Sequence, residues 1–222
     1  MQITARWNLK GTALDLLGHL MLYPPFAGKD GDAGSSNDNG CRRSAEIRAS
    51  WYKSDSEMAL DQETFRRAMG CFGTGVTVIT VDYEGEVQGM TANAFSSVSI
   101  DPLLVLVCVD QKARTHAHLH ARKRFGINVL SDQQRAISEH YAQPDRDPAR
   151  AEQEAGARFD RTAHGTPVLR GALSYLECRL RSAQDAGDHT IFIAEVEDVV
   201  VRDGKPLLYF QAEYRGIGGE IK

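Results

Sequence analysis

The chain has 222 residues, of which 42% are apolar and 25% charged, and this length is enough for one sizeable globular domain. The formal net charge of -4 excludes the broad basic surface of a nucleic-acid-binding protein, and no apolar run is long enough to cross a bilayer. The four cysteines form no CxxC pair, which excludes a disulfide framework or a cysteine zinc site and predicts a reducing, cytoplasmic compartment.

Residues 1–57 are predicted to form an N-terminal extension. Thr12 to Leu22 is mostly apolar but short, and Gly28 to Gly40 is rich in Gly, Asp, Ser and Asn, which is typical of a flexible linker. A signal peptide fits poorly, since the cationic start is weak and Asp15 interrupts the apolar run. We therefore expect a flexible extension over 1–57 and a complete domain over 58–222.

The domain shows a succession of strand signals with a few helices between them. Asp61 is placed to cap a helix that ends near Gly70, and Asp203-Gly204 signals a hairpin. Leu103 to Val109 is continuously apolar, which predicts a strand buried on both faces. Strands are predicted over 76–81, 87–99, 103–109, 125–130, 173–180, 190–201 and 207–214, and helices over 113–123 and 132–141.

This pattern favours an antiparallel barrel with peripheral helices. A doubly wound dinucleotide-binding fold would require regular alternation of strands and helices, together with a GxGxxG motif after a strand. The sequence contains neither signal, so that fold is disfavoured.

The segment from Gly89 to Ser99 is unusual for a strand because it mixes small and hydroxyl residues around Asn93. Small side chains let the backbone approach a flat ring such as an isoalloxazine, and amides and hydroxyls meet the ring's carbonyl and nitrogen atoms. From composition alone, a Ser/Thr-rich edge strand turned to solvent is the simpler interpretation.

Two other segments carry groups that suit a cofactor. Lys112-Ala113-Arg114-Thr115 opens a predicted helix with two cations, a hydroxyl and free amides, which together can hold a phosphate; the alternative is a solvated basic helix start. The histidine of Gly187-Asp188-His189 can hydrogen-bond a nicotinamide amide or balance charge on a reduced flavin, and the alternative is a surface turn histidine.

Four further polar residues are candidates for binding a metal or a cofactor. His116, His118 and His120 alternate on a predicted helix, and the first and last share a face, but no acidic or cysteine partner lies beside them, so no metal site is predicted. Asn128 stands in an apolar strand and needs hydrogen-bond partners, which are either backbone groups or a cofactor.

Taken in order, these segments resemble the short-chain flavin reductase family, especially the reductase components of two-component phenol and 4-hydroxyphenylacetate monooxygenases. Each motif is loose alone, but the ordered set is specific and outweighs the simpler alternatives given above. The resemblance covers roughly residues 60 to 217. The matching stretches are Phe65 to Gly70, Thr74 to Thr80, Gly89 to Ser99 with Asp101-Pro102, Phe125 to Leu130, Gly187 to His189, and Pro206 to Phe210.

The resemblance implies a mainly β protein, an FMN-binding split β-barrel with peripheral helices, working as a homodimer with the flavin near the subunit interface. It implies that NADH or NADPH reduces FMN or FAD, and that the reduced flavin leaves to serve a flavin-dependent monooxygenase partner. The sequence does not distinguish FMN from FAD, or NADH from NADPH.

The resemblance also assigns roles by position. His189 is expected to face the nicotinamide as the catalytic residue. Several relatives have a serine near the position of Arg114, which leaves the details of the phosphate contact open. The expected cofactor-binding residues are Thr91, Ala92, Asn93, Ala94, Phe95, Ser97 and Val98 along the isoalloxazine and ribityl, Cys108 and Val109 beside the ring, and Lys112, Ala113, Arg114 and Thr115 at the phosphate.

Two other functions remain open from the sequence. A flavin-binding electron carrier or sensor on the same barrel would retain its flavin and oxidise nicotinamide slowly. A non-flavin barrel used for protein interaction would leave the Gly89 to Ser99 segment as a polar edge, and such a protein would bind no added flavin.

Overall fold

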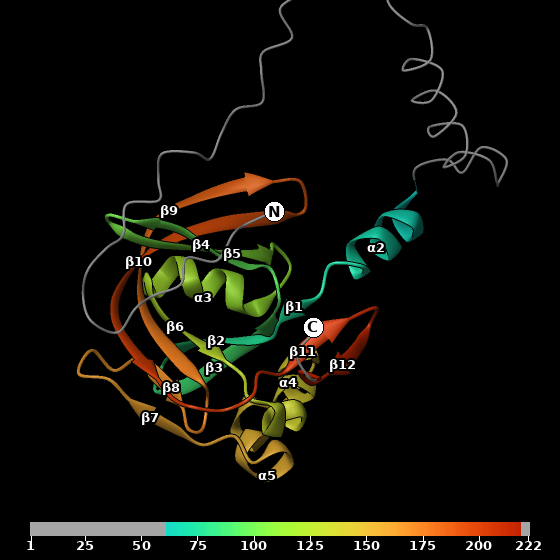
Figure 1. Ribbon diagram of the computed structural model, residues 1–222. Helices are drawn as coiled ribbons and strands as arrows, with labels where there is room; N and C mark the ends of the chain where they lie inside the picture. The colour runs from blue at the N-terminus through green and yellow to red at the C-terminus, as the bar shows by residue number, and fades with distance from the viewer. Residues whose placement is uncertain (1–60, 219–222) are drawn as a thin grey trace, which may run out of the picture. The chain divides into compact units, whose positions relative to one another are not determined.

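The structure is a computed structural model that describes residues 61–218, so the predicted extension over 1–57 lies outside the described residues (Figure 1). The helices are α2 (Gln62–Gly70), α3 (Arg114–Arg122), α4 (Arg135–Ala142) and α5 (Ala151–Ala155), with 3-10 turns η1 (Asp132–Gln134) and η2 (Pro148–Arg150). The strands are β1 (Thr74–Gly75), β2 (Thr77–Tyr83), β3 (Glu86–Ala92), β4 (Phe95–Ile100), β5 (Leu103–Asp110), β6 (Arg124–Val129), β7 (Phe159–Arg161), β8 (Pro167–Leu169), β9 (Ser174–Ala186), β10 (His189–Val201), β11 (Leu208–Phe210) and β12 (Glu213–Arg215).

Seven strands form one antiparallel sheet in the order β3-β2-β6-β9-β10-β5-β4. The strands at its two edges, β3 and β4, follow each other in the chain and are joined only by Asn93 and Ala94. A link this short requires the two edges to approach, so the sheet curls into a barrel that remains open between them (Figure 1). The prediction of a mainly β split barrel with peripheral helices is confirmed.

The interior of the barrel is filled by β-branched and aromatic side chains. Val107, Val109, Phe125 and Phe192 are fully buried, and Leu119 of α3 packs into the same cluster. Figure 1 shows α3 lying across the strands, where it closes this core.

Strand β5 corrects one prediction. Val105, Val107 and Val109 are buried, whereas the residues between them, including Leu106 and Cys108, are only partly buried. The continuous apolar run therefore has one core face, because side chains alternate across an antiparallel strand. Its second face is apolar but only partly buried, whereas the sequence predicts burial of both faces.

A second core lies outside the barrel, under α4. Ile137 and Tyr141, four residues apart, are both buried there against Val78 and Leu130. The predicted single helix over 132–141 is divided into η1 and α4, since Ser131 and Gln134 form a reciprocal capping box around the first turn.

The hairpin predicted at Asp203-Gly204 is wrong. The segment after β10 does not return along that strand, because Arg202 N–H donates to Leu173 O at 2.7 Å and Asp132 N–H donates to Lys205 O at 2.8 Å. These bonds lead the chain past the end of β6 to β11, which pairs with β1 and β12 instead.

None of the helices within residues 61–218 is long and apolar enough to span a membrane.

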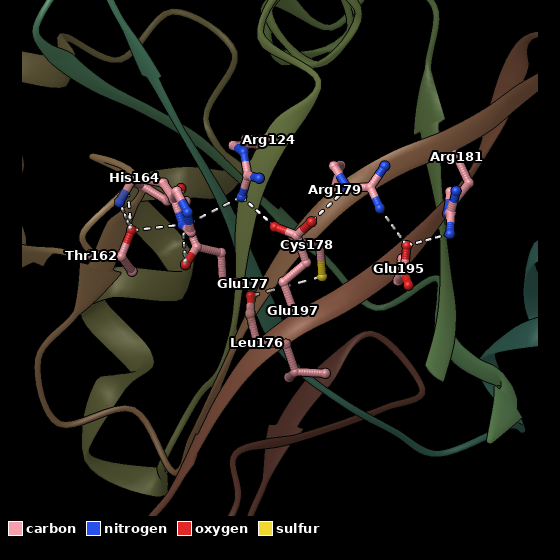
Figure 2. Close-up of polar contacts among 11 residues, drawn as sticks. Arg124, Thr162, His164, Leu176, Glu177, Cys178, Arg179, Arg181, Glu195 and Glu197 are labelled. Carbon is pink, nitrogen blue, oxygen red and sulfur yellow. Dashed lines mark hydrogen bonds and ion pairs between the residues drawn. The ribbon is translucent and has the colours of Figure 1, made fainter. Parts of the chain in front are cut away.

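The outer face of β6, β9 and β10 carries a row of ion pairs, here called the charge ladder: Arg124, Glu197, Arg179, Glu195 and Arg181 (Figure 2). Every cation of the ladder contacts a carboxylate. Arg179 contacts both glutamates, with Nε 2.5 Å from Glu197 and Nη2 2.6 Å from Glu195, and Arg181 also reaches Glu195 at 2.6 Å.

Glu177 lies at the end of this ladder and is 2% exposed. Its carboxylate accepts hydrogen bonds from Thr166 Oγ1 at 2.6 Å and Thr162 Oγ1 at 2.9 Å, and His164 Nδ1 lies 3.3 Å away (Figure 2). Burial favours the neutral acid, but these donors and the charge of His164 outweigh it and hold the pKa of Glu177 below its ordinary value.

Candidate functional site

One end of the barrel brings together predicted site residues from distant parts of the chain. Asp110 at the end of β5 is paired with His189 at the start of β10, and Cys108 with Ile191. Gln111 N–H donates to Asp188 O at 3.1 Å, which fixes the β9–β10 turn against the loop that leads into α3. The strand end, the basic segment and the turn histidine therefore form one surface.

The predicted ring wall joins this surface through the backbone. Cys108 N–H donates to Ala94 O at 3.0 Å, and Phe95 is paired with Val107. The connection between β3 and β4 thus lies beside the end of β5.

The residues of the predicted ring wall fall into two groups. Asn93, Ala94, Ser97 and Val98 are exposed and available to a ligand. The others serve the fold: Thr91 Oγ1 donates to Ser138 O at 2.7 Å, Ala92 is buried in the core, and Phe95 packs against it.

The predicted phosphate segment divides in the same way. Thr115 is buried and its hydroxyl donates to Gly89 O at 3.2 Å, while Ala113 is the N-cap residue of α3. Lys112 and Arg114 are exposed, and neither forms an ion pair with any residue of the range 61–218. Arg114 Nη2 instead donates to the carbonyl oxygen of Arg146 at 2.9 Å. The two cations remain available to an anion.

His189 is held by its neighbour in the chain. Its Nδ1 lies 2.7 Å from Asp188 Oδ1, and its side chain is 43% exposed. The hydrogen bond to His189 lowers the pKa of Asp188. A proton on Nδ1 leaves Nε2 as an acceptor in the neutral ring, which suits an amide N–H of a ligand. The sequence predicts a role for His189 but gives no sign that Asp188 orients its ring.

The alternating histidines of α3 form contacts within the fold. His116 Nε2 lies 2.9 Å from Thr190 Oγ1, which in turn donates to Asp185 Oδ1 at 2.7 Å, and burial followed by the charge of His120 lowers the pKa of His116. His118 stacks on Tyr83 with ring centroids 4.1 Å apart. Over residues 61–218, no group of three His, Cys, Asp or Glu side chains is arranged to hold a metal ion.

The hydrogen-bond partners of the Asn128 side chain are groups of the protein itself. Its Nδ2 donates to Val78 O at 2.9 Å and to Thr80 Oγ1 at 3.0 Å, and its Oδ1 accepts from Leu169 N–H at 2.8 Å. The fully buried amide therefore links β2, β6 and β8, and it takes no part in the candidate site.

Arg146 is a candidate residue that the sequence analysis missed. Its guanidinium carbon lies 5.0 Å from the centroid of the Tyr141 ring, and Nη1 donates to Gln143 O at 2.7 Å. Its Nε is buried and has no hydrogen-bond partner within the described part of the chain. The surrounding sequence indicated only a loop, and nothing in it signalled contact with Arg114.

A cavity of about 540 Å³ lies at the other end of β3, away from the predicted ring wall. It is lined by Glu86, Val87, Pro148, Ala149, Ala151, Glu152, Ala157, Arg158, Phe159 and Arg170. None of the cofactor-binding residues expected from the resemblance is among them, so the predicted ring wall is not part of this cavity.

Comparison with known proteins gives a consistent result. Residues 69–218 match the family described as flavin reductase like domain. The chain is 37% identical over 155 residues to an NADH-dependent flavin reductase from Rhodococcus sp, covering 68% of this chain and 84% of that protein. It is 36% identical over 155 residues to the reductase component of 4-nitrophenol 4-monooxygenase/4-nitrocatechol 2-monooxygenase from Rhodococcus opacus, covering 70% and 80%.

Solved structures agree. The NADH:FAD oxidoreductase of Streptomyces globisporus C-1027, in complex with NAD and FAD fragments, superposes with a TM-score of 0.68 and 33% identity, covering 76% of this chain and all of that chain.

Proposed function

Because the chain belongs to the flavin reductase family and has its split β-barrel fold, we propose that it uses NADH to reduce a flavin, FAD or FMN, and releases the reduced flavin to a partner monooxygenase. Two relatives support the two halves of this reaction: one is named for NADH-dependent flavin reduction, the other as a reductase component of a monooxygenase. The electron-carrier and protein-interaction alternatives have no comparable support.

The observation that carries the proposal is the convergence at one end of the barrel of Ala94, Cys108, Lys112, Arg114 and His189. The donor set fits a flavin, since small exposed residues leave backbone accessible to a flat ring and neither cation forms an ion pair with a carboxylate among residues 61–218. When bound, the flavin accepts the hydride; these residues hold, orient and shield the reactants.

The first test measures NADH oxidation by purified protein with and without added FMN or FAD. We expect a rate that rises with the concentration of free flavin, which is the behaviour of an enzyme that treats flavin as a substrate. Tight flavin retention with slow oxidation would favour the electron carrier. Negligible oxidation of both NADH and NADPH would overturn the reductase proposal.

The role of His189 is tested by His189→Ala. We expect flavin reduction to slow by about tenfold, equivalent to about 1.4 kcal/mol in the barrier, with flavin affinity retained. His164→Ala is the matched control, because it also removes a half-exposed histidine that contacts a carboxylate. If both variants reduce flavin at the wild-type rate, His189 has no part in the reaction.

We also propose that the enzyme is a homodimer. Helix α2 has no buried residue and exposes Phe65 and Met69, and Phe72 just after it is also exposed. The turn between β4 and β5 exposes Ile100 and Leu103. Exposed apolar clusters of this kind mark interfaces, and a second copy would cover the open ring wall. Light scattering is expected to give twice the chain mass, and Phe72→Glu to shift the protein toward monomer; a monomeric wild type contradicts the proposal.

A cytoplasmic location is proposed on the state of the cysteines. Cys71, Cys108 and Cys178 are free thiols, and a reducing compartment would keep them so. Cell fractionation would contradict this assignment if the protein were recovered outside the cytoplasm.

A further inference from the structure

The turn that precedes His189 is held by Gln111 on the side of β5. This turn joins β9 to β10 through Gly187 and Asp188. Gln111 N–H donates to Asp188 O at 3.1 Å, and Gln111 Nε2 donates to His189 O at 3.4 Å. Both donors come from the loop between β5 and α3, so they restrain the turn from one neighbour of β10 only.

A second set of contacts ties the same hairpin to α3, and it is called here the turn clamp: His116 of α3, Thr190 of β10 and Asp185 of β9. Thr190 Oγ1 donates to Asp185 Oδ1 at 2.7 Å, and His116 Nε2 lies 2.9 Å from Thr190 Oγ1. Thr190 and Asp185 are partners in the β9–β10 ladder. The turn clamp therefore joins both strands of the hairpin to α3, one residue away from His189.

The direction of each hydrogen bond in the turn clamp follows from the number of available protons. A threonine hydroxyl has one proton, and that of Thr190 is donated to the Asp185 carboxylate. The bond between His116 and Thr190 therefore uses the imidazole Nε2–H as its donor. Burial, and then the charge of His120, lower the pKa of His116, which favours a neutral ring with its single proton on Nε2.

The turn clamp lies on the face of β10 opposite to the candidate site. Alternate side chains of a strand share a face, so Thr190 and Phe192 point toward the core while His189 points away from it. Thr190 and Phe192 are fully buried, and the His116 ring packs edge-on against Phe192 with centroids 5.4 Å apart. An effect of these residues on the candidate site therefore passes through the backbone of β10.

Hydride transfer is sensitive to small displacements of a group that orients the reactants. The reacting atoms need a separation of about 3–3.5 Å, and a misplacement of about 1 Å can cost about a hundredfold in rate. Turns are less restrained than the strands that they connect, and His189 is the first residue after this turn. A hydrogen bond that ties the next residue to a helix limits the movement of His189.

We propose that the turn clamp positions His189 for hydride transfer from NADH to the flavin. Gln111 holds the turn on the side of β5, and the turn clamp holds β9 and β10 against α3. This inference rests on the proposed flavin reductase function and adds to it three positioning residues that act without touching the reactants.

The first experiment mixes the full chain and bound flavin with saturating NADH without oxygen and follows flavin reduction in a single turnover. Thr190→Val keeps the shape of the side chain but removes the hydroxyl. We expect it to slow reduction about fivefold, the effect of one lost neutral hydrogen bond, with the Kd for flavin unchanged. Thr190→Ser keeps the hydroxyl and should restore most of the rate. A Thr190→Val protein that reduces flavin as fast as the wild type would overturn the inference.

A double variant tests whether the turn clamp acts through His189. In the His189→Ala background, Thr190→Val should cause no further loss of rate, because no ring remains to be positioned. The same fivefold loss in both backgrounds would show that the Thr190 hydroxyl acts independently of His189, and the inference would be wrong.

Asp185 offers a variant with little risk to folding, because it is exposed. Asp185→Ala removes the acceptor of the Thr190 hydroxyl and should slow reduction about threefold. Asp198→Ala is the matched control, since it removes an exposed carboxylate from the far end of the same hairpin, where Oδ1 accepts from Val199 N–H. Equal rates of reduction in the two aspartate variants would contradict a role for the turn clamp.

Amide hydrogen exchange, followed by mass spectrometry of peptides, tests the turn clamp without catalysis. Residues 185–190 should exchange faster in Thr190→Val than in the wild type or Thr190→Ser, whereas β6 and α4 should be unchanged. Unchanged exchange over 185–190 would overturn the inference. If the wild type fails to oxidise NADH, the proposed function is wrong, and the exchange pattern still decides whether the turn clamp restrains the turn.

Discussion

Two clusters of arginine in this molecule have opposite electrostatic surroundings. In the charge ladder, Arg124, Arg179 and Arg181 each contact a glutamate (Figure 2). Beside β3, Arg114 and Arg146 contact each other and no carboxylate among residues 61–218. The protein has more acidic than basic residues. The absence of a carboxylate contact for Arg114 and Arg146 among residues 61–218 therefore does not reflect a general shortage of acidic side chains.

The difference teaches how a structural cation differs from a ligand-binding one. A paired cation satisfies its donors within the fold, and its removal costs stability. An unpaired, half-buried cation leaves donors for a ligand, and its removal should cost binding instead. The comparison therefore predicts that variants of the charge ladder lose stability, whereas variants at Arg146 lose ligand binding.

The largest loss of stability is expected at the buried end of the ladder. Glu177→Gln removes the charge that Thr162, Thr166 and His164 surround, and we expect about 2 kcal/mol of destabilisation. For a domain of this size the midpoint of thermal unfolding would fall by roughly 4–8 °C. Glu139→Gln, at an exposed helical ion pair with Arg135, is the control and should change little. A Glu177→Gln protein as stable as the control would contradict the structural role.

The second expected effect is on the acid side of the stability profile. Because the folded state lowers the pKa of Glu177, its contribution to stability is present above the ordinary glutamate pKa and is lost as the pH falls through the folded value. The wild type should therefore lose stability below about pH 4.5 more steeply than Glu177→Gln. Urea unfolding at a series of pH values measures this, and parallel profiles would contradict it.

A smaller effect is expected at the exposed end of the ladder. Arg181 is 46% exposed on its side chain and shares Glu195 with Arg179. Arg181→Gln should cost about 0.5 kcal/mol at low salt and less at high salt, where exposed pairs are screened. A cost that is independent of salt would indicate lost packing of the side chain rather than a lost charge.

The smallest change in stability is expected at the other cluster. Arg146→Gln removes a partly desolvated cation with no carboxylate partner among residues 61–218, so the free energy of unfolding without ligand should stay within about 0.5 kcal/mol of wild type. Added FAD should then raise the midpoint of the wild type more than that of the variant. A large loss of stability without ligand would make Arg146 a structural residue.

The sequence predicted the fold well where the signals are local. Asp61 caps α2 by accepting from Thr64 N–H at 2.7 Å, as its position indicated, and most strands lie where β-branched runs stand. The failures at β5 and at Asp203-Gly204 have a different origin. In both, tertiary contacts decide which face is covered or where the chain runs, and no local pattern contains that information.

The candidate site shows the same division. Lys112, Arg114 and His189 were identified from the sequence, and the structure brings their segments together. The hydroxyls of Thr91 and Thr115 were predicted for the cofactor, but they donate to backbone carbonyls in this chain. Arg146 was missed because its partner lies 32 residues earlier, and a contact at that separation leaves no periodic signal.

Asn128 has a consequence for how the barrel reaches its native pairing. Its single amide satisfies three groups on β2 and at the end of β8, and it does so only in the native alignment of β6 with β2. A slip of one residue would turn this side chain to the opposite face and leave buried polar groups without partners. Asn128 therefore favours the native register of β6 over shifted pairings, which the apolar residues of neighbouring strands would not distinguish by themselves.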